Sequence, residues 1–298
     1  MAEVIGRFAP TPSGRMHLGN VFAGMLAWLS AKSRGGEMVL RMEDLDTMRT
    51  SSEFAEILRS DLLWLGLPWD RETEPQSKRA HVYDGYFQLL KEKKLLYPCY
   101  CTRSQLHSVN APHLSDGTYV YPGTCRELQN PPADRLPSWR VKVPDRIWSL
   151  TDKVQGAYSE NLSTDCGDFV VRRADGVYVY QLAVTVDDGE AGVTEVVRGM
   201  DLLSSAPRQM YLQELFGFSH PQYAHVPMLL APDGRRLSKR DKDQDLGVLR
   251  QKMSAEELIG RLAFAAGLTE KPEKVSAKEL AADFCWEKVQ KSDIVLSL

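Results

Sequence analysis

The chain has 298 residues, of which 43% are hydrophobic and 26% are charged, and its formal net charge is -3. This composition is sufficient for a sizeable hydrophobic core and excludes a largely disordered chain. The small net charge indicates no general affinity for nucleic acid, so any RNA contact would depend on local basic patches.

The N-terminus and the distribution of apolar residues indicate a soluble protein. Residues 1–9 have neither the basic segment nor the apolar segment of a signal peptide. No run approaches the roughly 18 apolar residues that a membrane span requires. We therefore expect a cytoplasmic monomer without membrane contact.

The first part of the chain alternates predicted strands and helices. Apolar patterns predict a strand over residues 4–9, a helix that includes 22–29, a strand over 38–42 and a helix over 54–65. Prolines and a glycine interrupt the pattern after the first strand, and a glycine and a proline follow the second helix. This alternation predicts an α/β fold with a doubly wound parallel sheet.

The pattern changes in the middle of the chain. Residues 99–168 contain short segments, many prolines and paired cysteines, which is typical of an insertion with its own small fold. After it we expect strands over residues 176–186 and 193–198, a helix that ends at Phe216 and Gly217, and a strand over residues 223–230.

The remaining residues are predicted to be helical. Two capping boxes, Ser254 to Glu257 and Ser276 to Glu279, each precede an apolar run. We therefore expect a catalytic domain in two halves, over residues 1–98 and 169–246. An insertion occupies residues 99–168, and a helical tail occupies residues 247–298.

The loop after the first strand carries a candidate nucleotide-binding motif. It reads Pro10-Thr11-Pro12-Ser13-Gly14-Arg15-Met16-His17-Leu18-Gly19-Asn20. Open α/β sheets bind nucleotides at this position, where the positive end of a helix faces the phosphates. His17 could stabilise charge that develops on a phosphate. Taken alone, the motif is equally compatible with an ordinary strand-to-helix loop.

A second candidate motif lies far downstream. It reads Ala231-Pro232-Asp233-Gly234-Arg235-Arg236-Leu237-Ser238-Lys239-Arg240. A flexible lysine such as Lys239 can neutralise a pyrophosphate leaving group during the reaction. An isolated charge run of this kind is more commonly a solvated basic loop.

Together the two segments resemble the His-Ile-Gly-His and Lys-Met-Ser-Lys-Ser motifs of class I aminoacyl-tRNA synthetases. The blocks at residues 7–14, 41–46 and 197–202 resemble the glutamyl branch of this family, and the likeness covers most of residues 4–242. The resemblance implies a Rossmann-type catalytic core. It also implies a ligase that activates L-glutamate with ATP, which Mg²⁺ would accompany.

The motifs depart from the family pattern at polar positions. Asn20 stands where the first motif ends in histidine, and Arg236 and Arg240 stand at the first and last positions of the second. Asn20 still donates hydrogen bonds, and Lys239 keeps the central lysine. By resemblance, the catalytic residues are His17, Asn20 and Lys239, and the ATP-binding residues are Pro10, His17, Gly19, Asn20, Leu237, Ser238 and Lys239.

Glutamate has two carboxylates and one ammonium group, so its pocket needs an arginine and an acidic side chain. Arg7, Arg198 and Glu43 could provide these groups. Tyr180 is expected to offer a hydroxyl from the strand over residues 176–186. The resemblance implies glutamate contacts from Arg7, Phe8, Ala9, Pro10, Thr11, Glu43, Tyr180 and Arg198.

Three cysteines of the insertion form a candidate metal site. Cys99, Cys101 and Cys125 supply three thiolates, and a closed tetrahedral zinc site needs a fourth ligand. Candidates are His107, His113 and Tyr121. The spacing of Tyr121 to Cys125 resembles that of the small glutamyl-queuosine synthetase family, so we choose Tyr121 and expect one structural Zn²⁺. The alternative is three free cysteines in an irregular loop.

The same family suggests the acceptor of the glutamate. About 50 residues follow Gly247, too few for an anticodon-binding domain of ordinary size. With the cysteine pattern, this resembles glutamyl-queuosine synthetases and implies transfer to the queuosine base in the anticodon of tRNA(Asp). The alternatives are a shortened glutamyl-tRNA synthetase that charges a tRNA 3′ end and a non-catalytic RNA-binding paralogue.

Overall fold

A computed structural model describes residues 3–102, 105, 120–235 and 245–296, and its first elements form a parallel sheet. These elements are β1 (Ile5–Phe8), α1 (Leu18–Lys32), β2 (Glu37–Leu40), α2 (Ser52–Trp64) and β3 (Arg71–Glu72). The strand order is β1-β2-β3, with Ile5 opposite Glu37. The predicted alternation of strands and helices is confirmed in this part of the chain.

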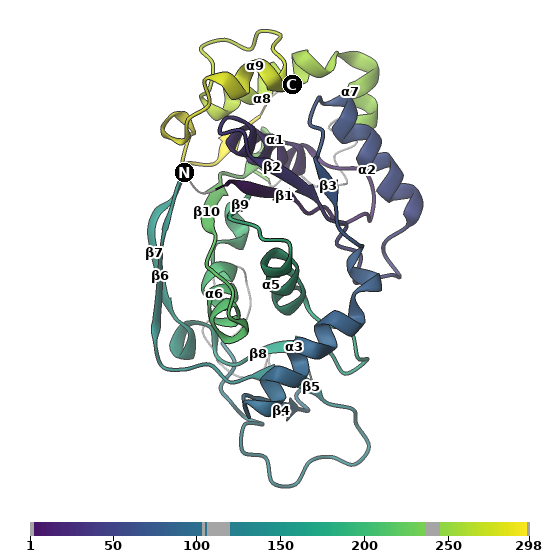
Figure 1. Cartoon of the computed structure of the whole chain (residues 1–298), viewed down its shortest axis with the longest axis vertical. Helices are drawn as coiled ribbons and strands as arrows, with labels where there is room; N and C mark the ends of the chain where they lie inside the picture. Colours follow the sequence, from purple (N-terminus) through teal and green to yellow (C-terminus); the bar gives the residue numbers. More distant parts are fainter. Residues whose placement is uncertain (1–2, 103–104, 106–119, 236–244, 297–298) are drawn as a thin grey trace.

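A second parallel ladder lies beside the first. It joins β9 (Glu195–Gly199) to β10 (Gln222–Val226), and α6 (Ser205–Phe216) connects the two strands. The backbone N–H of Thr194 donates to the carbonyl of Ile5 at 2.9 Å, which places β9 alongside β1. The two ladders therefore meet edge to edge, as the prediction of an α/β core requires (Figure 1).

The strand predicted over residues 176–186 is wrong. The strand β8 (Phe169–Arg172) ends earlier, and the helix α5 (Tyr180–Glu190) takes its place. The helix is buried over residues 182–188, and a short, mostly apolar run does not distinguish a buried helix from a buried strand. Tyr180 is therefore the first residue of a helix.

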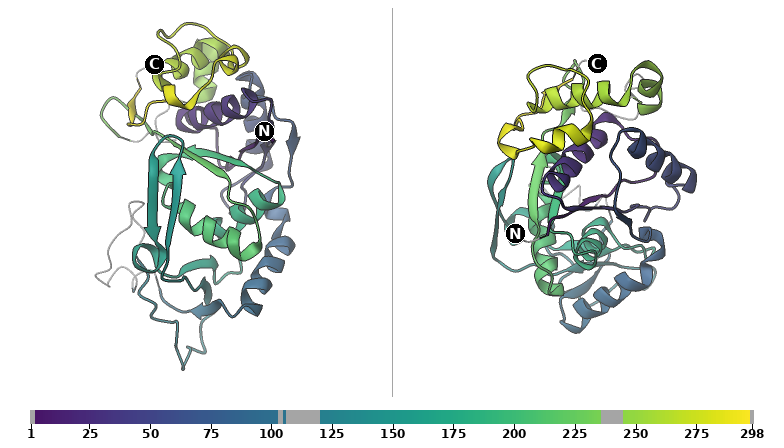
Figure 2. Two further views of the ribbon diagram at one scale, coloured as in Figure 1. Left: turned by 60° about the vertical axis from the view of Figure 1, so that its left-hand side comes forward. Right: turned by 45° about the horizontal axis from the view of Figure 1, so that its top comes forward.

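The middle of the chain forms two antiparallel units. The strands β4 (Leu96–Cys99) and β5 (Ser138–Val141) pair with each other, and β5 pairs with β8. The helix α3 (Ala80–Glu92) precedes this sheet. The hairpin of β6 (Ile147–Asp152) and β7 (Gly156–Asn161) runs along one side of the molecule toward β10 (Figures 1 and 2).

This middle segment shares its core with the catalytic domain. Val141, Trp148 and Leu162 belong to the same hydrophobic cluster as buried side chains of α5 and α6. The sheet also uses a strand that ends at Cys99 and one that begins at Phe169. The hydrophobic effect therefore ties the segment to both halves of the chain.

The C-terminal part packs against α1 (Figure 1). Both predicted capping boxes are present, at Ser254 with Glu257 and at Ser276 with Glu279. The elements of this part are β11 (Leu229–Leu230), α7 (Leu246–Lys252), α8 (Ala255–Ala266), α9 (Ala277–Ala282) and β12 (Ile294–Val295), with a single turn at Trp286–Lys288. Elsewhere in the chain, short helical turns lie at Gln76–Lys78, Leu162–Cys166 and Met200–Leu202. Within the described ranges, no helix combines the length and apolar character needed to cross a membrane.

A buried carboxylate connects this C-terminal part to the first motif. Asp61 of α2 is fully buried and contacts Arg15 Nε at 3.2 Å and Arg250 Nη1 at 2.7 Å. Burial raises the pKa of Asp61, although both arginines favour its charged form. The motif loop, α2 and α7 are thus held together by one charge.

Replacing Asp61 with alanine should lower the free energy of unfolding by about 2 kcal/mol or more, because two partly buried arginines lose their partner. The matched control is Glu56→Ala, since Glu56 is 75% exposed in its ion pair with Arg59. That change should cost less than about 0.5 kcal/mol. Urea unfolding measures both, and equal losses would contradict the role given to Asp61.

Candidate active site

A cavity of about 560 Å³ opens between the first motif, α1, Glu43, α5 and β9. All described residues that were predicted to bind ATP or glutamate line it: Arg7, Phe8, Ala9, Pro10, Thr11, His17, Gly19, Asn20, Glu43, Tyr180 and Arg198. The fold therefore brings residues from both halves of the chain to one cavity.

The start of α1 forms one end of the cavity. His17 is the N-cap residue, and its carbonyl accepts the N–H groups of Asn20 and Val21 at 2.9 and 3.2 Å. A Cβ atom at Gly19 would lie 3.0 Å from the His17 ring, so glycine gives the ring space beside the helix. Because the positive end of the helix dipole faces this region, it suits a phosphate group.

The second half of the second motif, residues 236–240, falls outside the described residues. Leu237, Ser238 and Lys239, with Arg236 and Arg240, all lie there. On one side of this segment, Leu229 lines the cavity. On the other side, the backbone of Asp245 pairs with that of His17.

A network of buried charges forms the wall beside α5. Arg41 is fully buried, and its guanidinium contacts Asp188 at 2.6 Å and Glu43 at 3.1 Å. Arg7 Nε lies 3.5 Å from the same Asp188 carboxylate. Burial opposes the charge on Asp188, but Arg41 and Arg7 hold its pKa below the ordinary value. The Asp188 carboxylate is therefore paired with the two arginines.

The pKa of Glu43 is shifted in the opposite direction from that of Asp188. Burial raises its pKa, because Arg41 compensates its charge only in part. A cation placed in the cavity would stabilise the ionised form of Glu43. The side chain can thus receive an ammonium group.

Arg198 of β9 lines the cavity and is held by neutral side chains. Its Nε donates to His225 Nε2 at 2.9 Å and its Nη1 donates to Gln209 Oε1 at 2.8 Å. The Tyr180 hydroxyl lies 3.5 Å from Nη1, and burial raises the pKa of this phenol. Among the described residues, Arg198 Nη2 has no hydrogen-bond partner. This nitrogen can donate to a bound carboxylate.

His225 of β10 is held on its other side by Asp152. Its Nδ1 lies 2.6 Å from Asp152 Oδ2, and both side chains are fully buried. Burial lowers the pKa of His225 to about 4, and the neighbouring Arg198 acts in the same direction. The neutral ring therefore donates from Nδ1 to Asp152 and accepts from Arg198 at Nε2.

Several of these residues were missed by sequence reasoning. Arg41 had been quoted only as part of a motif block, and Asp188, Gln209, His225 and Asp152 had no role. Two of them, Arg41 and His225, are ionisable groups between buried apolar residues, as in the run Ala224-His225-Val226. A charged or polar residue inside a buried run was the available signal.

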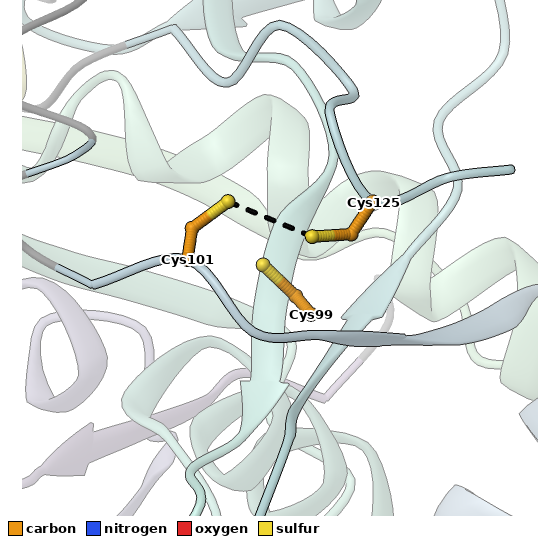
Figure 3. A group of neighbouring side chains, drawn as sticks. All are labelled: Cys99, Cys101 and Cys125. Atoms are coloured by element: carbon orange, nitrogen blue, oxygen red, sulfur yellow. Dashed lines mark hydrogen bonds between the residues drawn. The ribbon is translucent and has the colours of Figure 1, made fainter. Parts of the chain in front are cut away.

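The three predicted cysteine ligands come together in the middle segment (Figure 3). Their sulfur atoms lie within 4.8 Å of one another, and Cys101 and Cys125 are 3.6 Å apart. Two thiolates of a tetrahedral zinc site lie about 3.8 Å apart, given bond lengths of about 2.3 Å. The cluster could therefore hold a metal ion.

The hydroxyl of Tyr121 lies beside the same cluster. It is 3.5 Å from Cys99 Sγ and 3.7 Å from Cys101 Sγ. The guanidinium of Arg140 packs 3.6 Å from the centre of the Tyr121 ring and donates to Cys99 Sγ at 3.2 Å. This positive charge favours the thiolate of Cys99, which is the metal-binding form. The alternative ligands His107 and His113 lie outside the described residues.

The parallel α/β core and the cavity at a helix start define a nucleotide-binding enzyme that can hold an amino-acid carboxylate. Residues 3–295 match the family "tRNA synthetases class I (E and Q), catalytic domain", and the chain belongs to this family of ligases.

Similar proteins are found over nearly the whole chain. It is 44% identical to the Glutamyl-Q tRNA(Asp) synthetase of Symbiobacterium thermophilum, over 94% of this chain and 91% of that protein. It is 43% identical to the protein of the same name from Nitratidesulfovibrio vulgaris, over 88% and 86%. A solved glutamate tRNA ligase from Elizabethkingia meningosepticum is similar, with a TM-score of 0.83 and 28% identity over 99% of this chain and 67% of the ligase.

The buried histidine predicts a specific loss of stability in acid. The pKa of His225 is about 4 in the folded chain against an ordinary value of 6.5, so between these values the unfolded chain binds more protons. The stability contribution is complete above pH 6.5 and is lost as the pH falls toward 4. Asp152 has a lowered pKa, so its own loss lies below this window.

Between pH 7 and pH 4.5 the unaltered protein should lose about 2 to 3 kcal/mol more stability than His225→Gln, which has no ionisation there. Urea unfolding at the two pH values measures the difference. Parallel losses in both proteins would show that His225 is not buried in its neutral form.

Proposed function

We propose that this protein activates L-glutamate with ATP and then transfers the glutamyl group to the queuosine base of tRNA(Asp). The observation that carries the proposal is the cavity that Arg198 and Glu43 line together with the start of α1. The relatives named Glutamyl-Q tRNA(Asp) synthetase support the choice of acceptor, because they match this chain over most of its length.

In this proposal the amino acid occupies the end of the cavity near α5. Arg198 donates to a carboxylate of glutamate, with Arg7 beside it, and Glu43 accepts from the ammonium group. Tyr180 adds a neutral hydroxyl. The segment from Phe8 to Thr11 forms the wall of this site.

ATP would occupy the end near α1. A glutamate α-carboxylate oxygen attacks the α-phosphorus, the bond to the β-phosphate oxygen breaks, and pyrophosphate leaves. We assign His17, Asn20 and Lys239 to stabilising the charge on the phosphates, together with contacts from Pro10, Gly19, Leu237 and Ser238. Mg²⁺ is expected to enter with ATP.

In the second step a hydroxyl of the acceptor attacks the carbonyl carbon of the adenylate. An ester forms, AMP leaves, and the hydroxyl proton is released. Queuosine offers the hydroxyls of its cyclopentene diol, and a site that hydrogen-bonds such groups rejects bases that lack them. The solved glutamate tRNA ligase favours a second candidate, the charging of a tRNA 3′ end, at a lower identity of 28%.

The acceptor is tested with labelled glutamate and three purified RNAs. Queuosine-containing tRNA(Asp) should accept glutamate, whereas unmodified tRNA(Asp) and tRNA(Glu) should not. Acceptance should persist when the 3′ adenosine lacks both hydroxyls, because that ribose is not the acceptor. Nuclease mapping should place the label on the anticodon nucleotide, and label at the 3′ end of tRNA(Glu) would establish the second candidate.

We propose that the metal of the cysteine cluster is zinc, bound by Cys99, Cys101, Cys125 and Tyr121. Three soft thiolates favour Zn²⁺ over the hard cations. Four protein ligands leave no open position, so the metal would stabilise the middle segment and take no part in the reaction.

Metal analysis of the purified protein should find about one Zn²⁺ per chain, and Cys101→Ser should abolish it because a thiolate is lost. Tyr121→Phe should speed the release of zinc to a chelator. His107→Ala and His113→Ala are the matched controls and should leave retention unchanged. Release caused by either histidine change would assign the fourth position to that histidine.

A further inference from the structure

The three arginines around the amino-acid end of the cavity are held in different ways. Arg7 and Arg41 both contact the carboxylate of Asp188, and Arg41 also contacts Glu43. Arg198 contacts His225, Gln209 and Tyr180 and forms no ion pair with the described residues. Its charge is therefore not neutralised by direct contact with a carboxylate.

We propose that His225, oriented by Asp152, is a positioning residue that fixes Arg198 for a substrate carboxylate while leaving the charge of Arg198 available. The inference rests on the proposed activation of glutamate and adds residues that have no assigned role. His225 does not line the cavity, so it acts through Arg198.

A histidine suits this task because its ring can accept a hydrogen bond without carrying a negative charge. Asp152 Oδ2 at 2.6 Å fixes the proton on Nδ1, and Nε2 is then an acceptor for Arg198 Nε at 2.9 Å. A carboxylate at the position of the ring would pair with Arg198 and weaken its attraction for a substrate. The imidazole separates the charge of Asp152 from the guanidinium.

Asp152 is itself fixed by the backbone. Its carboxylate accepts the N–H groups of Val154 and Gln155 at 2.9 Å each, and the N–H of His225 at 3.0 Å. These bonds belong to the turn of the β6–β7 hairpin and to the adjoining strand β10. The hairpin thus sets the position of a cavity arginine that it does not touch.

Gln209 of α6 provides a second neutral support. It accepts from Arg198 Nη1 at 2.8 Å, and its amide nitrogen donates to Gln181 Oε1 at 3.0 Å. Two of the three guanidinium nitrogens are therefore held from β10 and α6. Since the guanidinium is planar, these two contacts also fix the direction of Nη2.

The test is ATP–pyrophosphate exchange with glutamate in two matched variants. His225→Asn can keep the contact with Asp152 but is too short to reach Arg198, whereas His225→Gln can span both partners. We expect His225→Asn to raise the KM for glutamate about 10- to 100-fold, as when a supporting partner of a binding group is lost. The KM for ATP should change less than about threefold, and His225→Gln should restore most of the glutamate affinity.

A second variant tests the charge argument. Gln209→Glu is nearly isosteric but places a carboxylate on Arg198, so it should also raise the KM for glutamate with little effect on ATP. Thermal unfolding shows whether each variant is folded. If His225→Asn does not fold, the glutamate KM of Gln209→Glu alone tests the inference.

A merely structural role for these residues would raise both KM values together or lower only the stability, and either result would overturn the inference. A glutamate KM within threefold of the unaltered protein in a folded His225→Asn would do the same. A separate outcome is that the unaltered protein shows no glutamate-dependent exchange. The proposed function would then be wrong, and this inference would fail with it.

Discussion

The cavity depends on one buried carboxylate, Asp188 of α5. It contacts Arg7 at the end of β1 and Arg41 directly after β2, both more than 140 positions earlier in the chain. A buried charge without its partners is strongly unfavourable, so the two arginines and the aspartate must be buried together. The two halves of the sheet and the cavity wall therefore form as one structure.

The arginines around the cavity differ in whether their charge is already paired with a carboxylate of the protein. Asp188 and Glu43 engage Arg7 and Arg41, whereas neutral side chains hold Arg198. A cation that is fixed in place and not already paired is preorganised for an anion, since little needs to rearrange on binding. Selectivity for a carboxylate can thus arise because no acidic side chain of the described residues forms an ion pair with Arg198.

The middle segment is held together beside the cysteine cluster, and its hairpin attaches it to the second half of the catalytic domain. Near the cysteine cluster, the buried Asp168 accepts from the Tyr97 hydroxyl and from Arg126, each at 2.7 Å. Farther along, the β6–β7 hairpin places Asp152 against His225. A metal ion that stabilises the cluster would therefore support a segment that also contributes to the position of Arg198.

The sequence by itself determined the α/β class, the parallel strands, both capping boxes and the residues that line the cavity from the first motif. These depend on periodicity, turn residues and short motifs, which act over a few positions. Only the tertiary structure decided that residues 180–190 are a helix, because burial on all sides removes the periodic signal. It also decided how Arg198 is positioned, since His225, which accepts from Arg198, is held by Asp152, 73 positions away in the chain, through packing between elements.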